Sequence, residues 1–165
     1  MKKSLTSTKK FYKKHAEELR VSGRILKILQ LMPKWIYKRD ILDVGCGNGF
    51  ITTCMKVYAN DVNWIDIEEN IVTYSEDKQY DAVTCFDVLE HIPPAGFEKA
   101  LCNILNLCKD EGYIIINQPE QQDKSQPLDQ SIELDMLYPM LGTLQYLERY
   151  AVGSSESYNF MVFKK

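Results

Sequence analysis

The chain has 165 residues, of which 45% are hydrophobic and 26% are charged, and its formal net charge is −3 at pH 7. This length and apolar content suit one domain with a buried core, whereas the charge excludes a protein-wide cationic field for nucleic acid. No apolar run approaches the ~20 residues of a membrane span, and none follows the basic residues of "MKKSLTSTKK", so we expect neither a membrane partner nor a secretory signal.

The amino-terminal part is predicted to be helical. Apolar residues recur at a spacing of roughly 3.6 from about residue 8 to residue 32, with Gly23 as a break, and Pro33 ends the pattern. We therefore expect residues 1–34 to form a helical cap on a core of residues 35–165.

Strand and helix signals alternate through the middle of the chain. Continuous apolar runs predict strands that are buried on both faces, and helical spacing of apolar residues predicts the segments between them. The expected strands are residues 40–44, 62–66, 80–88 and 111–117, and the expected helices are residues 50–58 and 97–108.

The last third of the chain has a different pattern. Residues 119–141 form a polar and interrupted segment, after which residues 144–153 and 156–165 are predicted to form a β-hairpin. The fold class is therefore α/β: a mostly parallel sheet flanked by helices, with a C-terminal antiparallel hairpin, in a single domain of residues 1–165.

Three closely spaced glycines follow the first predicted strand, in "LDVGCGNGF". Glycine permits positive φ and removes the Cβ that would hold a ligand away, and the next helix offers unpaired N–H groups. A dinucleotide-binding fingerprint needs a third glycine at position 50, which is Phe50. The alternative is a strand–turn–helix in which the glycines serve geometry alone.

"LDVGCGNGF" resembles motif I of class I S-adenosylmethionine-dependent methyltransferases, which have a Rossmann-like fold. Asp43 occupies the position of that motif's acidic residue, two residues before the first glycine. The resemblance implies that S-adenosylmethionine is the cofactor, that the loop wraps its methionine part, and that Asp43 braces the loop. The loop residues expected to bind it are Gly45, Cys46, Gly47, Asn48 and Gly49.

An acid at the end of the second strand would accept hydrogen bonds from the two ribose hydroxyls. Asp61 and Asp66 compete for this role. A strand ending at Asp61 would leave too few residues after Gly49 for a parallel crossover, which needs a dozen or more. We therefore choose Asp66, with Ile67 beside it as a further cofactor contact.

The segment "YDAVTCFDVLEHIPP" is similar to the fourth-strand region of small-molecule class I methyltransferases, and "CKDEGYIIIN" resembles the family's next turn and strand. The resemblance covers roughly residues 39–118 and implies a cofactor contact at Phe86. Only thirteen residues separate Asp66 from Tyr80, where the family normally fits a helix and a third strand. The sheet is therefore expected to be shortened after its second strand, with a bare edge through which a homodimer can form.

The candidate catalytic residue is His91, because histidine is a common general base in enzymes and this one follows the third expected strand. Its alternative role is to hold the loop. Tyr12 lies on the first expected helix, where it either touches the cofactor or packs the helix. Met136, Tyr138 and Met140 either line an acceptor pocket or belong to the core.

The leading interpretation is methyl transfer to oxygen, nitrogen or sulfur of a small-molecule acceptor or a peptide, in a cytoplasmic protein whose cysteines stay reduced. The Asn/Asp-Pro-Pro-aromatic tetrad of enzymes that methylate amides is absent, since residues 86–89 read Phe-Asp-Val-Leu. Five cysteines without CxxC or histidine spacing predict neither disulfides nor a metal site. Two other readings stay open: an inactive cofactor-binding subunit or regulator, and an NAD-dependent oxidoreductase.

Overall fold

The computed structural model describes residues 23–66, 70–120, 132–154 and 156–165. Its strands are β1 (Asp40–Val44), β2 (Asp61–Ile65), β3 (Tyr80–Phe86), β4 (Cys108–Pro119), β5 (Thr143–Val152) and β6 (Glu156–Lys164). Its helices are α2 (Gly23–Leu31), α3 (Pro33–Ile36), α4 (Phe50–Met55), the 3-10 helix η1 (Leu89–His91), α5 (Pro94–Leu107) and α6 (Leu134–Leu141).

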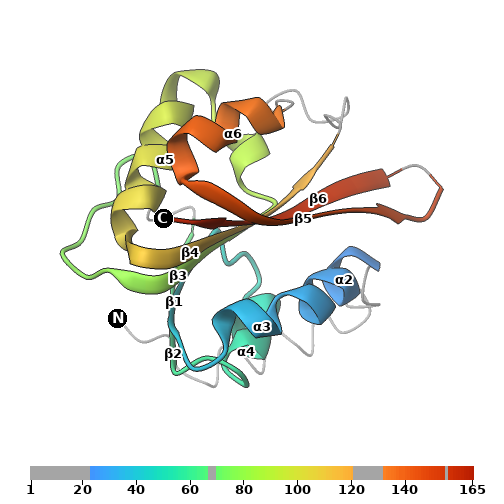
Figure 1. The fold of residues 1–165 in the computed structure, drawn as a ribbon, viewed down its shortest axis with the longest axis horizontal. Helices are drawn as coiled ribbons and strands as arrows, with labels where there is room; N and C mark the ends of the chain where they lie inside the picture. The colour runs from blue at the N-terminus through green and yellow to red at the C-terminus, as the bar shows by residue number, and fades with distance from the viewer. Residues whose placement is uncertain (1–22, 67–69, 121–131, 155) are drawn as a thin grey trace.

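The strands form one six-stranded sheet in the order β2-β1-β3-β4-β6-β5 (Figure 1). The strands β2, β1, β3 and β4 run parallel, and β6 lies antiparallel between β4 and β5. The predicted fold class, a mostly parallel sheet with a C-terminal antiparallel hairpin, is confirmed.

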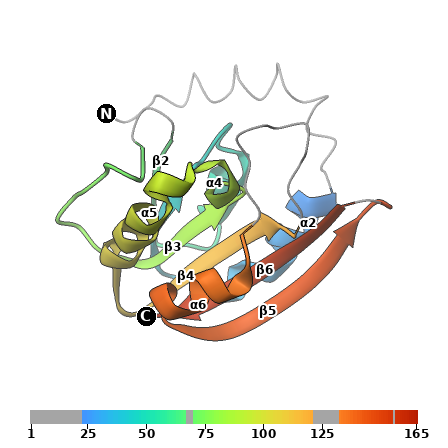
Figure 2. The same cartoon turned by 90° about the horizontal axis from the view of Figure 1, so that it is seen from above.

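Helices cover both faces of the sheet. Figure 1 shows α5 and α6 on one face and α2, α3 and α4 on the other, and Figure 2 shows the long, twisted hairpin of β5 and β6 from above. Two groups of buried apolar residues fill the layers, one beneath α5 and α6 and one beneath α2, α3 and α4. The strands β1 and β3 are covered on both faces, and their sequences are therefore largely apolar.

Several element boundaries differ from the predicted ones. The helix α4 ends at Met55 rather than near residue 58, and α5 begins at Pro94, because proline suits the first turn of a helix, where no N–H bond is needed. The helix α6 lies inside the segment expected to be interrupted. Its buried Leu137 and Leu141 are four residues apart, but Pro139 between them obscures the helical pattern.

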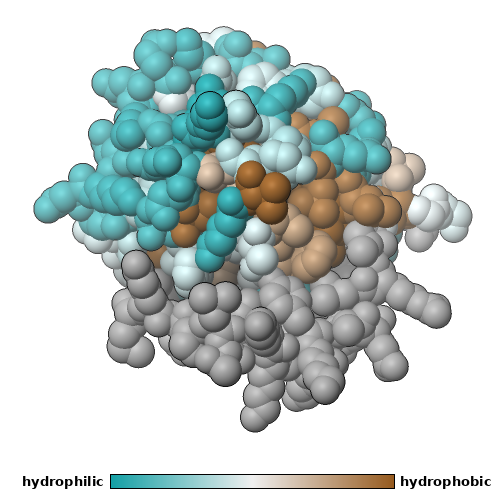
Figure 3. Space-filling view, turned by 90° about the horizontal axis from the view of Figure 1, so that it is seen from below, coloured by the Kyte–Doolittle hydropathy of each residue, from teal (hydrophilic) through white to brown (hydrophobic). Residues whose placement is uncertain are grey.

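The sheet is shortened after β2, as predicted. Residues 70–79 contain a turn but neither a helix nor a strand, and within the described ranges β2 pairs only with β1. Figure 3 shows the molecule from below, and apolar residues gather on one side of the face seen there. None of the helices in the described ranges is long and apolar enough to cross a membrane.

Candidate cofactor site

The carboxyl ends of the parallel strands meet at one edge of the sheet. Val44 at the end of β1 pairs with Ile65 on one side and with Cys85 on the other. The segments that leave these strands, which begin with Gly45, Asp66 and Asp87, therefore start side by side. In open parallel sheets, the crevice outside this edge is where ligands bind.

The glycine loop, residues 45–49, is hydrogen-bonded to the end of β2. The main-chain N–H groups of Gly45 and Cys46 both donate to the carbonyl of Ile65, at 2.9 and 3.2 Å. The N–H of Gly49 donates to the carbonyl of Cys46 at 2.8 Å, which completes a tight turn into α4. The Asn48 side-chain carbonyl accepts from the N–H of Phe50 at 3.0 Å, so Asn48 stabilises the start of the helix.

The first and second glycines of the loop have different surroundings. Both have positive φ, +73° at Gly45 and +50° at Gly47. A Cβ placed on Gly45 would lie 2.2 Å from Cγ2 of Val88, whereas a Cβ on Gly47 would meet no described atom within 4 Å. The space beside Gly45, which we expected a ligand to occupy, is therefore filled by Val88. The space beside Gly47 is open to a ligand.

Asp43 is buried beneath this loop and holds two elements together. Its carboxylate accepts hydrogen bonds from the hydroxyl of Thr52 in α4 and, at 2.8 Å, from the hydroxyl of Thr84 in β3. Burial raises the pKa of Asp43 to about 6, although both hydroxyl groups act to lower it. Asp43 thus braces the strand, the helix and the neighbouring strand from below the loop.

The raised pKa of Asp43 predicts a pH-dependent stability. The folded protein binds the Asp43 proton more tightly than the unfolded chain, so this stabilisation is fully present below the unfolded pKa of 3.8 and is lost as pH rises through about 6. The stability of the wild type relative to Asp43→Asn is expected to fall by about 3 kcal/mol over this window. Urea unfolding of both proteins between pH 4 and 7.5 measures the change, and a difference independent of pH would contradict it.

The two competing acids lie at opposite ends of β2. Asp66 directly follows the last strand residue, and the Cys46 thiol donates to its carboxylate at 3.7 Å, so it lies beside the glycine loop. Asp61 begins the strand at the other end of the sheet and is 3.6 Å from the Lys78 ammonium. The structure thus places Asp66, and not Asp61, at the carboxyl edge.

The remaining predicted site residues have varied positions. The Phe86 ring is buried and stacks on Phe160 with a centroid distance of 6.3 Å, so it belongs to the core beneath the edge. His91 ends η1 with a side chain that is 55% exposed, and its Nε2 lies 4.0 Å from Glu90 Oε1. Tyr12 and Ile67 lie outside the described residues.

Sequence reasoning missed a polar network at the ends of β3 and β4. The Asp87 carboxylate accepts a hydrogen bond from the Asn117 amide at 3.0 Å and lies 3.2 Å from Nε of Arg24 in α2. The Asn117 side-chain carbonyl accepts from the Tyr150 hydroxyl at 2.7 Å. The sequence does show that Asp87 is an acid at the end of an apolar strand. Its partners, however, come from segments far away in the sequence, so the network itself could not be predicted.

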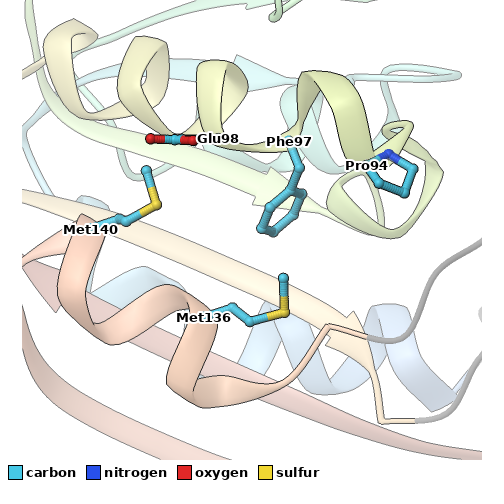
Figure 4. A pocket seen from close by; sticks show the side chains of 5 residues that line it. All are labelled: Pro94, Phe97, Glu98, Met136 and Met140. Atoms are coloured by element: carbon cyan, nitrogen blue, oxygen red, sulfur yellow. The ribbon is translucent and has the colours of Figure 1, made fainter.

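A separate pocket lies between α5 and α6 (Figure 4). Its volume is about 270 Å³, and its lining residues are Pro94, Phe97, Glu98, Met136 and Met140. The third residue expected near an acceptor pocket, Tyr138, packs against Phe163 instead. No residue of the glycine loop lines this pocket.

Among the described residues, no group of three histidine, cysteine or acidic side chains is placed to bind a metal ion.

Comparison with known protein families identifies the class of this fold and site. Residues 13–152 match the family described as "Methyltransferase domain". This match covers most of the chain, and the chain therefore belongs to that family of methyltransferase domains.

The curated relatives are ubiquinone biosynthesis O-methyltransferases. The one from Rickettsia bellii (strain OSU 85-389) is 31% identical over 100 residues, which are 47% of this chain and 41% of the relative. The one from Photobacterium profundum is 23% identical over 150 residues, which are 76% of this chain and 59% of the relative. The chain thus spans about half the length of the curated relatives it matches.

Solved structures share the fold at low sequence identity. The N-methyltransferase NodS from Bradyrhizobium japonicum WM9, in complex with S-adenosyl-L-homocysteine, has a TM-score of 0.75 at 10% identity, with 97% of each chain covered. The 1,6-didemethyltoxoflavin-N1-methyltransferase from Burkholderia thailandensis, with bound 1,6-didemethyltoxoflavin and S-adenosylhomocysteine, has a TM-score of 0.74 at 14% identity, with 97% of this chain and 86% of that chain covered. These similarities establish the fold alone.

Proposed function

We propose that the protein binds S-adenosylmethionine at the carboxyl edge of β1, β2 and β3 and transfers its methyl group to oxygen, nitrogen or sulfur of a small-molecule acceptor. The observation that carries this proposal is the glycine loop, which is closed onto the end of β2 and leaves open space above Gly47, with Asp66 beside it. Family membership and neighbours that bind S-adenosylhomocysteine support it.

Each part of the edge has a role in this proposal. The main chain of residues 45–49 and the side chain of Asn48 hold the methionine part, and the Asp66 carboxylate accepts hydrogen bonds from the ribose hydroxyls. Contacts at Tyr12, Ile67 and the main chain of Phe86 complete the cofactor site, and His91 acts as a base beyond η1. When bound, S-adenosylmethionine supplies a methyl group bonded to a positively charged sulfur, which is a good leaving group. The chain's own contribution is to position the acceptor and to exclude water.

The partners and the cellular location of the protein are proposed from its net charge, its cysteines and the outer edge of its sheet. The net charge of −3 favours neither nucleic acid nor an anionic surface as a partner, and free cysteines fit the cytoplasm. The unpaired outer side of β2 in the described part of the chain favours a homodimer that pairs through this strand.

A turnover assay tests this function. The protein is incubated with S-adenosylmethionine labelled in its methyl group and with the small-molecule fraction of a cell extract. We expect label in a small molecule and release of an equal amount of S-adenosylhomocysteine. Binding of S-adenosylhomocysteine without any turnover would instead indicate an inactive cofactor-binding subunit.

A further inference from the structure

The pocket between α5 and α6 is lined by side chains from both helices. Pro94, Phe97 and Glu98 of α5 lie across it from Met136 and Met140 of α6 (Figure 4). Its volume of about 270 Å³ is just below the ~300–1,000 Å³ of pockets for drug-sized ligands. The pocket therefore has room for a molecule smaller than a drug, such as one substituted aromatic ring.

The helices that form the pocket are anchored by other residues than the two methionines. Leu137 and Leu141 are fully buried and hold α6 against the rest of the fold. Met136 and Met140 are four residues apart, so they share a different side of the helix, and Met136 is 42% exposed. The Phe97 ring opposite them is buried. The pocket thus has one fixed aromatic wall and one wall of side chains that are free to adjust.

The apolar part of the lining suits an aromatic ligand. Methionine has three rotatable bonds and a polarisable sulfur that makes favourable contacts with aromatic rings. Aromatic rings also attract each other in offset or edge-to-face arrangements, which the Phe97 ring can offer. In Figure 4 this ring and the side chains of Met136 and Met140 point toward one another across the gap. A ligand ring placed between them would contact all three side chains.

The charge of the lining comes from one residue. Glu98 is the charged side chain among the five that line the pocket, and its carboxylate lies at the Met140 end (Figure 4). In the part of the chain that the structure describes, Glu98 has neither an ion pair nor a hydrogen bond. A cationic group on the ligand would gain from this carboxylate, and a cation near the Phe97 ring gains further from the ring face. Charge complementarity therefore favours a ligand that is positively charged.

The surface around the pocket fits a small molecule better than a protein partner. A specific protein interface buries about 1,200–2,000 Å² and has an apolar core. On this face of the sheet, the large apolar side chains that are exposed in the described ranges are Met136 and Tyr138. Two such residues do not supply the apolar core of an interface, whereas a pocket that encloses one ring needs no more.

We propose that the pocket between α5 and α6 binds an arylalkylamine, a small molecule that carries an aromatic ring and a protonated amine. The ring lies between Phe97 and the two methionines, and the ammonium group lies against the Glu98 carboxylate. This ligand site goes beyond the proposed function, because no residue of the glycine loop lines it. Binding there involves no chemical step and does not require the cofactor.

The test uses three probes of similar size that differ in charge: benzylamine, benzyl alcohol and benzoate. The protein carries ¹³C in its methionine methyl groups, and NMR spectra are recorded as each probe is added. We expect benzylamine to shift the methyl resonances of Met136 and Met140 in a saturable manner, because an aromatic ring changes the field around them. The resonances of Met32 and Met55, which are fully buried on the opposite face of the sheet, should stay in place.

Two charge reversals test the role of the carboxylate. Wild type should bind benzylamine about two- to fivefold more tightly than benzyl alcohol, the range that an exposed charge pair provides. Glu98→Lys should reverse this selectivity and bind benzoate more tightly than benzylamine. Asp135→Lys is the matched control, because Asp135 is an exposed acid of α6 that does not line the pocket. This control should keep the selectivity of wild type, and Met136→Ala should weaken benzylamine and benzyl alcohol alike.

A repeat of the titration with S-adenosylhomocysteine present separates this site from the carboxyl edge, and the Kd for benzylamine should change by less than about threefold. Four results would overturn the proposal: no shift of the Met136 and Met140 resonances at tens of millimolar benzylamine, equal affinity of wild type for all three probes, unchanged selectivity in Glu98→Lys, or displacement of benzylamine by S-adenosylhomocysteine. A protein that binds benzylamine here but does not bind S-adenosylhomocysteine would support this site and contradict the proposed function.

Discussion

Gly45→Val is expected to destabilise the protein by about 2–5 kcal/mol and to abolish binding of S-adenosylhomocysteine at ordinary temperature. Left-handed backbone costs an L-residue about 1–2 kcal/mol, and overpacking of a filled site costs typically 1–3 kcal/mol more. Both terms apply, because φ is +73° at Gly45 and an added Cβ would lie 2.2 Å from Cγ2 of Val88. This loss is a large part of the 5–15 kcal/mol that stabilises a typical domain.

Gly153→Val is the matched control for this effect. Gly153 has φ +66°, and an added Cβ there meets no described atom within 4 Å, so only the backbone term applies. Urea unfolding should show a smaller loss for Gly153→Val and, in the Val88→Ala background, a partial recovery for Gly45→Val. Equal losses for the two glycine variants would show that the Val88 contact is energetically irrelevant.

Asp66→Ala is expected to weaken S-adenosylhomocysteine binding by ~1–3 kcal/mol, which is a factor of about 5–150 in Kd. The carboxylate at the end of β2 lies beside the loop residue Cys46, where it can accept hydrogen bonds from both ribose hydroxyls. Its removal would leave those hydroxyls without their acceptor in the bound state. Calorimetric titration of the purified variant measures the change.

Asp61→Ala is the control for this prediction. Asp61 is on the same strand, at the opposite end of the sheet, and its exposed carboxylate is paired with Lys78. An exposed ion pair of this kind contributes little, so both stability and affinity should stay close to wild type. If Asp61→Ala weakened binding and Asp66→Ala did not, the placement of the ribose at Asp66 would be wrong.

Sequence patterns predicted the parallel part of the fold well for a physical reason. The strands β1 and β3 are buried on both faces, so their short, largely apolar runs have few other interpretations. The helix α6 could not be predicted in this way. It is short, contains Pro139, and is stabilised by burying Leu137 and Leu141 against the rest of the fold.

The candidate site was predictable only where one segment carries it. The loop from Gly45 to Gly49 and the acid after β2 are local signals, and the length needed for a parallel crossover favoured Asp66 over Asp61. The Asp87 network joins the residue after β3 to residues of α2, β4 and β5, and no single segment reveals that Arg24 and Asn117 meet at Asp87. The role of Val88 at Gly45 was hidden for the same reason, since the two residues are distant in sequence and meet only because they follow the neighbouring strands β1 and β3.

Calorimetric titration of the wild-type protein with S-adenosylhomocysteine, alongside NADH, is the most direct test of cofactor binding at the glycine loop. We expect one S-adenosylhomocysteine per chain with measurable heat, a rise in Tm on addition of the ligand, and neither effect with NADH. If S-adenosylhomocysteine and S-adenosylmethionine gave no heat and no shift in Tm with folded protein, the assignment of the carboxyl edge as a cofactor site would be contradicted.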